Sequence, residues 1–200
     1  KRDIENKIIE VIDKIAPNVN AIVVSDFVYG VITNRLLEYI QMIARKHKLV
    51  LIGDLQCSSQ LGDITRFTNF SLLCPNEREA RLALKAKESG IEQLSQMLIK
   101  KTMTERLIMK MGSEGFIAYD KNKDNELTRQ AFPALSINPL DVTGAGDSLL
   151  AVMAVGLASK QPMMANAALS CCMAALSVER MGNTTITADE LAENVLEVMS

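Results

Sequence analysis

The chain has 200 residues, of which 48% are hydrophobic, enough to bury one sizeable core. Its 22 basic and 24 acidic residues nearly balance and it has no Trp, a composition that argues against a nucleic-acid-binding protein. A zinc site is also unexpected, because the four cysteines lack C-x-x-C spacing and there is a single histidine.

The first part of the chain alternates helix and strand patterns. Apolar spacing predicts a helix that ends at Pro17. Residues 21–24 form a continuous apolar run rich in β-branched side chains, which is typical of a strand buried on both faces. Thr33 is expected to cap a helix that reaches about His47, and a second buried strand follows at residues 49–52.

The remaining elements continue this alternation. After an apolar run at residues 71–74, the patterns predict a helix from about Asn76 and another over 91–101. A hairpin follows, whose strands at 107–109 and 116–119 flank Gly112 and Gly115. The last predicted elements are helices over 144–157 and 163–181 and one from Asp189. The charged residues 120–126 are interpreted as a solvated hairpin turn or loop. These elements predict an α/β fold, a doubly wound and mostly parallel sheet with an antiparallel hairpin toward one edge, in a single domain over residues 1–200.

Residues 161–178 carry no charge and must be weighed against a membrane span. They include Gln161 and Asn166 and many small side chains, so we expect a buried helix and no contact with a membrane. The adjacent Cys171 and Cys172 within this stretch are interpreted as buried thiols, which suits a reducing compartment. No secretory signal opens the chain, and a cytoplasmic protein is therefore expected.

The sharpest motif is residues 141–148, Asp-Val-Thr-Gly-Ala-Gly-Asp-Ser, which lead directly into an apolar helix. A turn of small residues at a helix start leaves backbone N–H groups open to an anion, and the helix dipole favours negative charge there. Asp147 has two readings on chemistry alone. It is either a reactive carboxylate beside that anion or a residue that complements the helix N-terminus.

Residues 141–147 resemble the D-[TS]-x-G-A-G-D signature of the PfkB, or ribokinase-like, carbohydrate kinases. Val142 replaces the commoner Thr or Ser and is similar to the bacterial heptose-7-phosphate kinase branch. Residues 25–33 are similar to the family's S-D-Y-x-K-G-x-L-T stretch, Asn76 and Glu79 fit its N-x-x-E motif, and residues 110–115 fit its T-x-G-x-x-G nucleotide loop with Lys110 at the Thr position. The resemblance runs along nearly the whole chain and implies a ribokinase-like fold.

The resemblance also implies roles in phosphoryl transfer. Asp147 would act as general base, and Gly144, Ala145 and Gly146 would donate backbone N–H groups to the charge on the transferring phosphoryl group. Asn76 and Glu79 would organise Mg²⁺ near the phosphates of ATP, a role compatible with their reading as a helix cap and a first-turn carboxylate.

Further residues are implied to bind the nucleotide or an ion. Lys110 would point toward the nucleotide phosphates, although a solvated lysine at a strand end is an equally open reading. Gly112 and Gly115 would let the backbone approach the nucleotide. Counting from Gly182 places Cys171 near the adenine and leaves Asn166, five residues earlier, as incidental. Asp141, Thr143 and Gly182 match positions that help to bind a monovalent cation, for which K⁺ is the candidate.

The implied function is ATP-dependent phosphorylation of a hydroxyl on a sugar or sugar phosphate. The alternative is a non-catalytic nucleotide-binding or assembly module. Family members carry most sugar contacts and a small lid ahead of the segment similar to residues 25–33, so we expect that N-terminal part to be missing from this chain. The 200 residues alone are therefore expected to be inactive. Their expected partners are the sugar, that N-terminal half and further copies in a homo-oligomer.

Overall fold

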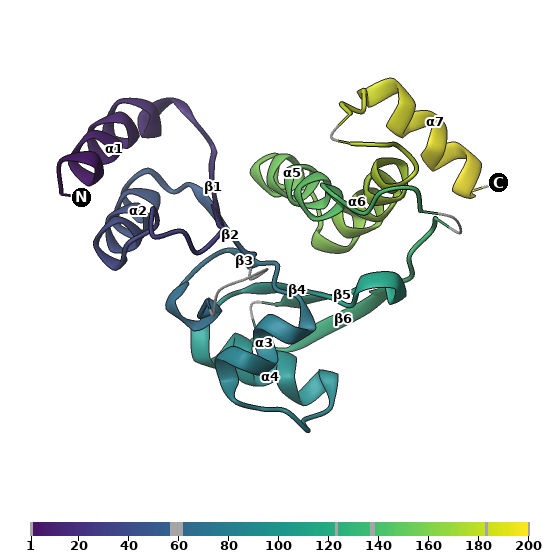
Figure 1. Ribbon diagram of the computed structural model, residues 1–200, viewed down its shortest axis with the longest axis horizontal. Helices are drawn as coiled ribbons and strands as arrows, with labels where there is room; N and C mark the ends of the chain where they lie inside the picture. Colours follow the sequence, from purple (N-terminus) through teal and green to yellow (C-terminus); the bar gives the residue numbers. More distant parts are fainter. Residues whose placement is uncertain (1, 57–61, 123, 137–138, 183, 200) are drawn as a thin grey trace. The chain divides into compact units, whose positions relative to one another are not determined.

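The computed structural model describes residues 2–56, 62–122, 124–136, 139–182 and 184–199 (Figure 1). The chain divides into two compact units, Lys1–Met109 and Lys110–Ser200. Cys57, one of the four cysteines, lies outside the described residues.

Parallel strands form the centre of the first unit. They are β1 (Ala21–Asp26), β2 (Val50–Leu55), β3 (Leu72–Leu73) and β4 (Arg106–Lys110), whose last residue, Lys110, belongs to the second unit. Ala21 pairs with Val50 in β1 and β2, Ile52 pairs with Leu72 in β2 and β3, and Leu73 pairs with Leu107 in β3 and β4. The carboxyl ends of these strands therefore meet at one edge of the sheet.

The helices of this unit follow from local capping signals. They are α1 (Arg2–Ile15), α2 (Asn34–His47), α3 (Glu77–Leu84) and α4 (Ile91–Thr102), with short 3₁₀ segments at Ala16–Asn18 and Ile64–Arg66. The Thr33 hydroxyl accepts a hydrogen bond from the backbone N–H of Leu36 at 3.2 Å, which confirms the predicted start of α2. Figure 1 shows α1 beside α2, and the two helices are joined by Arg35, which donates to Glu5 at 3.2 Å.

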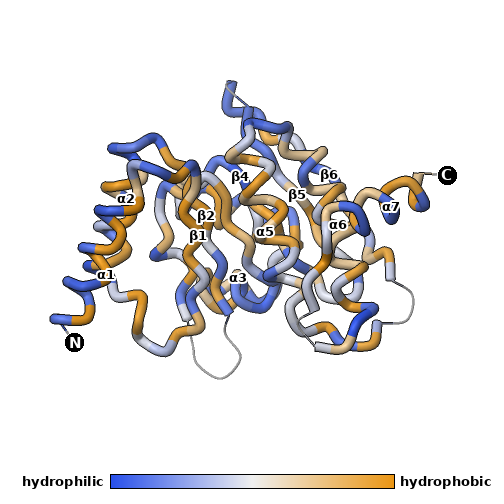
Figure 2. The backbone as a smooth tube through the Cα atoms, turned by 90° about the horizontal axis from the view of Figure 1, so that it is seen from above, coloured by the Kyte–Doolittle hydropathy of each residue, from blue (hydrophilic) through white to orange (hydrophobic). Residues whose placement is uncertain are grey.

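The core of the first unit lies on β2, β3 and α4, where Ile52, Leu72, Leu73, Leu94 and Leu98 are fully buried. Figure 2 shows the hydrophobic colouring of much of β1 and β2.

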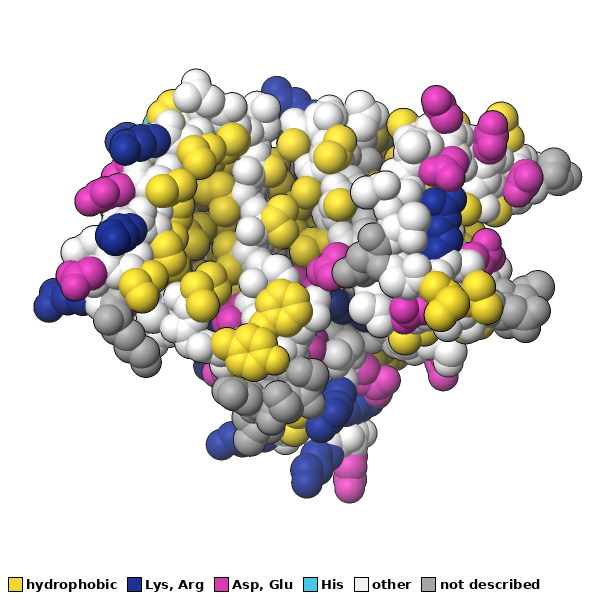
Figure 3. Space-filling model, turned by 45° about the horizontal axis from the view of Figure 1, so that its top comes forward, with side chains coloured by type: hydrophobic (Ala, Val, Ile, Leu, Met, Phe, Trp, Pro, Cys, Tyr) yellow, Lys and Arg dark blue, Asp and Glu magenta, His cyan; other side chains and the backbone are white. Residues whose placement is uncertain are grey.

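The prediction that the first strand is buried on both faces is wrong. Val24 is only 4% exposed to solvent, but its neighbour Val23, which points to the opposite face of the strand, is 43% exposed. Phe27 and Tyr29 are also exposed, and the yellow side chains in Figure 3 are hydrophobic residues that reach the surface.

The second unit begins with a turn and an antiparallel pair of strands. A 3₁₀ turn spans Gly112–Glu114, and the N–H of Met111 donates to the carbonyl of Gly115 at 2.8 Å. The strand β5 (Phe116–Lys121) pairs with β6 (Leu127–Phe132), from Phe116 opposite Phe132 to Lys121 opposite Leu127. The rings of Phe116 and Phe132 stack with centroids 5.2 Å apart.

Three helices complete this unit: α5 (Ala145–Ala158), α6 (Met163–Val178) and α7 (Ala188–Met199). The helices α5 and α6 pack closely at Gly156, where an added Cβ would lie 2.1 Å from Oδ1 of Asn166. Cys171 and Cys172 are both buried, as expected. Within the described ranges, no helix is long and apolar enough to cross a membrane.

The α/β class, the mostly parallel sheet and antiparallel pairing toward one edge are as predicted, but the pair described above, β5 with β6, includes a strand that was not predicted. Sequence reasoning missed β6, which has no apolar run because four of its six residues are exposed. It also placed the end of α6 at Met181, three residues after the observed end at Val178.

Candidate functional site

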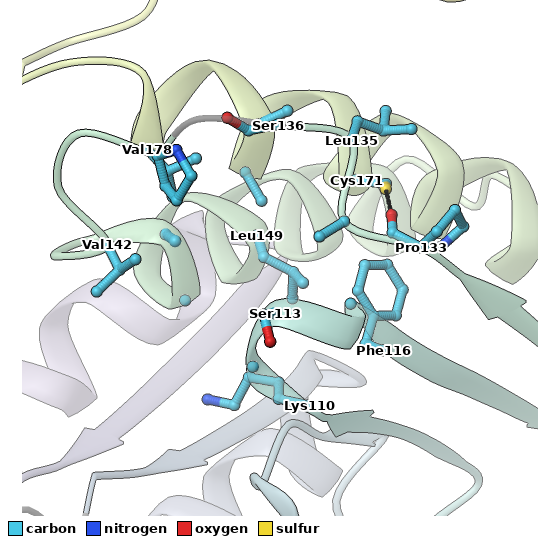
Figure 4. Close-up of a pocket in the computed structure, with 18 residues that line it drawn as sticks. Lys110, Ser113, Phe116, Pro133, Leu135, Ser136, Val142, Leu149, Cys171 and Val178 are labelled. Atoms are coloured by element: carbon cyan, nitrogen blue, oxygen red, sulfur yellow. Dashed lines mark hydrogen bonds between the residues drawn. The ribbon is translucent and has the colours of Figure 1, made fainter.

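A pocket of about 550 Å³ lies wholly within the second unit (Figure 4). The turn after β4, the segment after β6, the first turn of α5 and one face of α6 form its walls. The pocket brings together several residues singled out from the sequence, namely Lys110, Gly112, Gly115, Ala145, Gly146 and Cys171.

The first turn of α5 forms one end of the pocket. Gly144 is the N-cap residue, with φ +83° in the left-handed region that favours glycine. The N–H of Ser148 donates to the carbonyl of Gly144 at 2.8 Å, as the helical pattern requires. The N–H groups of a first helical turn have no acceptor within the helix, and they lie at the positive end of its dipole. We call residues 144–146 the anion-binding turn, after the role that the sequence predicts for them.

The ammonium group of Lys110 lies beside the anion-binding turn. A Cβ atom built on Gly146 would be 3.7 Å from Nζ of Lys110, an ordinary van der Waals distance. Figure 4 shows the Lys110 nitrogen directed away from Phe116. The helix N-terminus and the ammonium both attract anions, and we call this end of the pocket electropositive for these two groups, although the Asp147 carboxylate lies in the same helix turn.

The other end of the pocket is apolar. Its walls include Phe116, Pro133 and Leu149, together with one face of α6 that carries Cys171, Ala174, Ala175 and Val178. These four α6 residues follow i, i+3, i+4, i+7 spacing, which places them on one side of the helix. Their small size leaves a slot that an aromatic ring can enter.

Cys171 closes this apolar end as a neutral thiol. Its Sγ donates a hydrogen bond to the carbonyl of Pro133 at 3.0 Å, shown dashed in Figure 4. Burial, and secondarily the neighbouring Cys172, raises the pKa of the Cys171 thiol to about 11. The thiol therefore stays protonated at neutral pH and contributes packing and a weak donor.

The two glycines of the turn after β4 have different surroundings. Gly115 has φ +90°, and a Cβ there would lie 2.1 Å from the carbonyl oxygen of Phe132. Gly112 also has a positive φ, +61°, but nothing lies within 4 Å of its Cβ position. Gly115 is thus required by packing, whereas Gly112 leaves open space on the pocket wall.

The residues predicted to bind a monovalent cation are near one another. The carboxylate of Asp141 accepts hydrogen bonds from the N–H of Thr143 at 2.9 Å and from the N–H of Gly182 at 3.1 Å. A hydroxyl hydrogen bond from Thr143, together with these backbone hydrogen bonds, holds the pKa of Asp141 below its ordinary value of 3.8. Asp141 therefore joins the turn before α5 to the segment after α6, and cation binding itself stays a prediction.

Asn166 lies away from the pocket walls. Its side chain is buried, donates to the carbonyl of Gln161 at 3.1 Å and contacts Gly156 of α5. Its function in the structure is helix packing. Cys171 lines the pocket and Asn166 does not, and contact of Cys171 with a nucleotide stays a prediction.

Asn76 and Glu79 belong to the first unit and form a capping box at the start of α3. The N–H of Glu79 donates to Oδ1 of Asn76 at 2.8 Å, and the N–H of Asn76 donates to Oε2 of Glu79 at 2.8 Å. Glu79 is 3% exposed. In the part of the chain that the structure describes, no group of three His, Cys, Asp or Glu side chains could hold a metal on its own.

Sequence reasoning missed most of the apolar walls. Phe116, Pro133, Leu149 and Val178 belong to four separate segments, and only tertiary packing brings them together. The available signal was the spacing of residues 171, 174, 175 and 178 on one helical face, which by itself indicates only burial.

Comparison with known proteins gives the following matches. A protein-family model described as pfkB family carbohydrate kinase matches residues 3–190. The Bifunctional protein HldE of Geotalea uraniireducens is 26% identical over 196 residues, which cover 96% of this chain and 38% of that protein. The protein of the same name from Campylobacter jejuni strain RM1221 is 30% identical over 190 residues, covering 94% and 39%.

Solved structures share the fold at low sequence identity. Phosphofructokinase-2 from Escherichia coli in complex with potassium superposes with a TM-score of 0.77 and 13% identity, covering 96% of this chain and 62% of that one. Ribokinase from Arabidopsis thaliana, complexed with ribose and ATP, gives a TM-score of 0.74 and 19% identity, covering 91% and 57%. These likenesses confirm the predicted ribokinase-like fold. The chain spans 38% or 39% of the length of the two HldE proteins described above.

Proposed function

This chain belongs to the pfkB family of carbohydrate kinases, and we propose that it forms the nucleotide-binding and catalytic part of an enzyme that transfers the γ-phosphoryl group of ATP to a hydroxyl of a sugar or sugar phosphate. The pocket of the second unit carries this proposal. It joins an electropositive end, at the anion-binding turn and Lys110, to an apolar slot at Phe116 and Cys171. A nucleotide likewise has negatively charged phosphates at one end and a flat aromatic base at the other, and a volume of about 550 Å³ suits such a ligand.

Asp147 is the general base of the proposed reaction. It is exposed in the first turn of α5, where an acceptor hydroxyl can reach it. Its carboxylate takes the proton of that hydroxyl while the hydroxyl oxygen forms a bond to the γ-phosphorus. The bond from this phosphorus to the oxygen that bridges the β- and γ-phosphates breaks, and its electron pair leaves with ADP.

The anion-binding turn stabilises the phosphoryl group during transfer. Charge is spread over the three equatorial oxygens of that group in the transition state. Backbone N–H groups fixed at the start of α5 can donate to these oxygens without reorganisation, which is the principle of an oxyanion hole. Gly144 and Gly146 carry no side chain that would cover these donors.

Two ions belong to the proposal. Mg²⁺ would neutralise charge on the ATP phosphates, and Asn76 and Glu79 are the residues that the sequence resemblance implies for it, since Mg²⁺ commonly uses one or two carboxylates together with phosphates and water. K⁺ would bind at Asp141, Thr143 and Gly182. The Asp141 carboxylate accepts two backbone hydrogen bonds, and its further lone pairs can accept a cation.

The acceptor in this proposal is a heptose phosphate, and the compartment is the cytoplasm, where ATP is available. The similarity of residues 141–147, with Val142, to the heptose-phosphate kinase branch supports this acceptor. The match to the HldE proteins along nearly the whole chain supports it further.

Mg-ATP is expected to raise the melting temperature of the intact protein. At a concentration 100 times its Kd, a ligand that binds only the folded state adds about 2.7 kcal/mol, which corresponds to roughly 5–10 °C for a domain of this size. Thermal unfolding with and without Mg-ATP measures this shift, and a coupled assay with a panel of sugar phosphates measures turnover.

Two alanines of α6 provide matched variants for this test. Ala174→Phe fills the apolar slot, whereas Ala168→Phe adds the same ring at an exposed position outside the pocket. The ATP-induced shift should disappear in the first variant and persist in the second. An equal shift in both would show that ATP binds elsewhere, and binding without turnover on any sugar would favour the non-catalytic module.

A further inference from the structure

The structure gives Lys110 a neighbour that its sequence motif does not indicate. As part of the glycine loop at residues 110–115, it is expected to contact phosphates that are charged throughout the reaction. The structure brings its ammonium to within 3.7 Å of the Cβ position of Gly146, in the anion-binding turn. The two residues are far apart in the sequence and lie in different elements, β4 and α5.

We propose that Lys110 is a catalytic residue that contacts the transferring phosphoryl group itself and stabilises the negative charge on it in the transition state. This inference rests on the proposed kinase function. It goes beyond that function because it assigns Lys110 to the γ-phosphoryl group that is transferred and not to the α- and β-phosphates that remain in ADP.

The geometry at Gly146 supports this assignment. One oxygen can accept hydrogen bonds from two donors when these lie within about 6 Å of each other, twice the usual donor–acceptor distance of about 3 Å. The N–H of Gly146 is attached to the same Cα as the Cβ position beside the Lys110 ammonium, so both donors border the same space. A phosphoryl oxygen bound by the anion-binding turn is therefore within reach of the ammonium.

The surroundings of Lys110 increase the effect of its charge. Lys110 is partly buried, and it lines a pocket whose other walls are mostly apolar. Electrostatic interactions are stronger where water is excluded. A fixed cation at this point acts on the reaction in the same way as the arginine that other phosphoryl-transfer enzymes supply to the transition state.

During transfer, Lys110 moves no proton. Asp147 takes the proton of the acceptor hydroxyl, the new bond forms at the γ-phosphorus, and the electron pair of the broken bond leaves with ADP. The ammonium keeps its three protons and donates hydrogen bonds to the equatorial oxygens. Its contribution therefore appears in the rate of the chemical step.

The test compares Lys110→Met with Lys110→Arg in the intact protein. We expect Lys110→Met to lower kcat by about 10²–10³-fold, the range for loss of one transition-state donor. The Kd of ADP should change less than about threefold, because ADP lacks the transferred group. Binding of ADP with aluminium fluoride, an analogue of that group, should weaken strongly, and Lys110→Arg should restore part of kcat.

Lys121→Met is the matched control, since Lys121 is exposed at the end of β5 and does not line the pocket. It should retain wild-type kcat. If Lys110→Met keeps kcat within about threefold, or weakens ADP as much as the fluoride complex, the inference is overturned while the kinase function stands. If the wild-type protein transfers no phosphoryl group, both fail. The melting temperature of every variant is measured, so that a loss of activity through unfolding is recognised. Lys110→Gln provides a second variant without the positive charge in case Lys110→Met does not fold.

Discussion

Replacement of Asp147 by Asn in the intact protein is expected to lower kcat by about 10²–10⁴-fold, the contribution of a general base. Asn has nearly the same size as Asp and also favours helix N-termini, so folding should change little. Asp147 lies in the first turn of α5, beside the anion-binding turn. Loss of its negative charge there should leave the Kd of ATP unchanged or lower it.

A second helix provides the control for this substitution. Asp189 is an exposed aspartate in the first turn of α7, a helix that contributes no residue to the pocket, whereas Asp147 directly follows Gly146 of the pocket wall. Asp189→Asn should have the same small effect on melting temperature as Asp147→Asn and no effect on kcat. If Asp147→Asn keeps more than about a tenth of wild-type kcat, which is above the residual activity expected without a general base, Asp147 only complements its helix and the proposed mechanism is wrong.

The features predicted correctly are those that neighbouring residues determine. The capping box of Asn76 and Glu79 spans four residues, and Thr33 caps the helix that directly follows it. The start of α5 likewise depends on Gly144, the left-handed residue that directly precedes it. In each case the residue that the helix start requires is adjacent to that helix in the sequence, which is why the starts of these helices could be located.

The features that were missed depend on contacts between distant residues. The strand β6 consists mainly of exposed residues and is held by its pairing with β5, so its sequence has no hydrophobic pattern that would predict a strand. The exposure of Val23 depends on what covers each face of its sheet, which an apolar run cannot indicate. The proximity of Lys110 to Gly146 is of the same kind, because no local pattern relates the end of β4 to the start of α5.

The second large effect is expected from Gly115→Ala, which should destabilise the protein by about 3 kcal/mol or more. Gly115 has φ +90° and ψ −128°, a conformation that is essentially restricted to glycine and costs other residues about 1–3 kcal/mol. A Cβ at this position would also lie 2.1 Å from the carbonyl oxygen of Phe132 and 2.7 Å from the backbone nitrogen of Ala134. Backbone atoms cannot move aside as a flexible side chain can, so the substitution must displace the segment after β6 and add to the strain.

Gly112→Ala separates these two contributions, because Gly112 has a positive φ of +61° but no atom within 4 Å of its Cβ position. It should cost only the backbone strain of about 1–2 kcal/mol. Thermal unfolding of both variants measures the difference, and roughly 2–4 °C are expected per kcal/mol. Since Gly115 and the displaced Pro133 and Ala134 all line the pocket, Gly115→Ala should also weaken Mg-ATP binding. Equal melting temperatures for the two variants would show that the segment from Phe132 to Ala134 is not packed against Gly115, and the pocket would then lack the wall on which its apolar end depends.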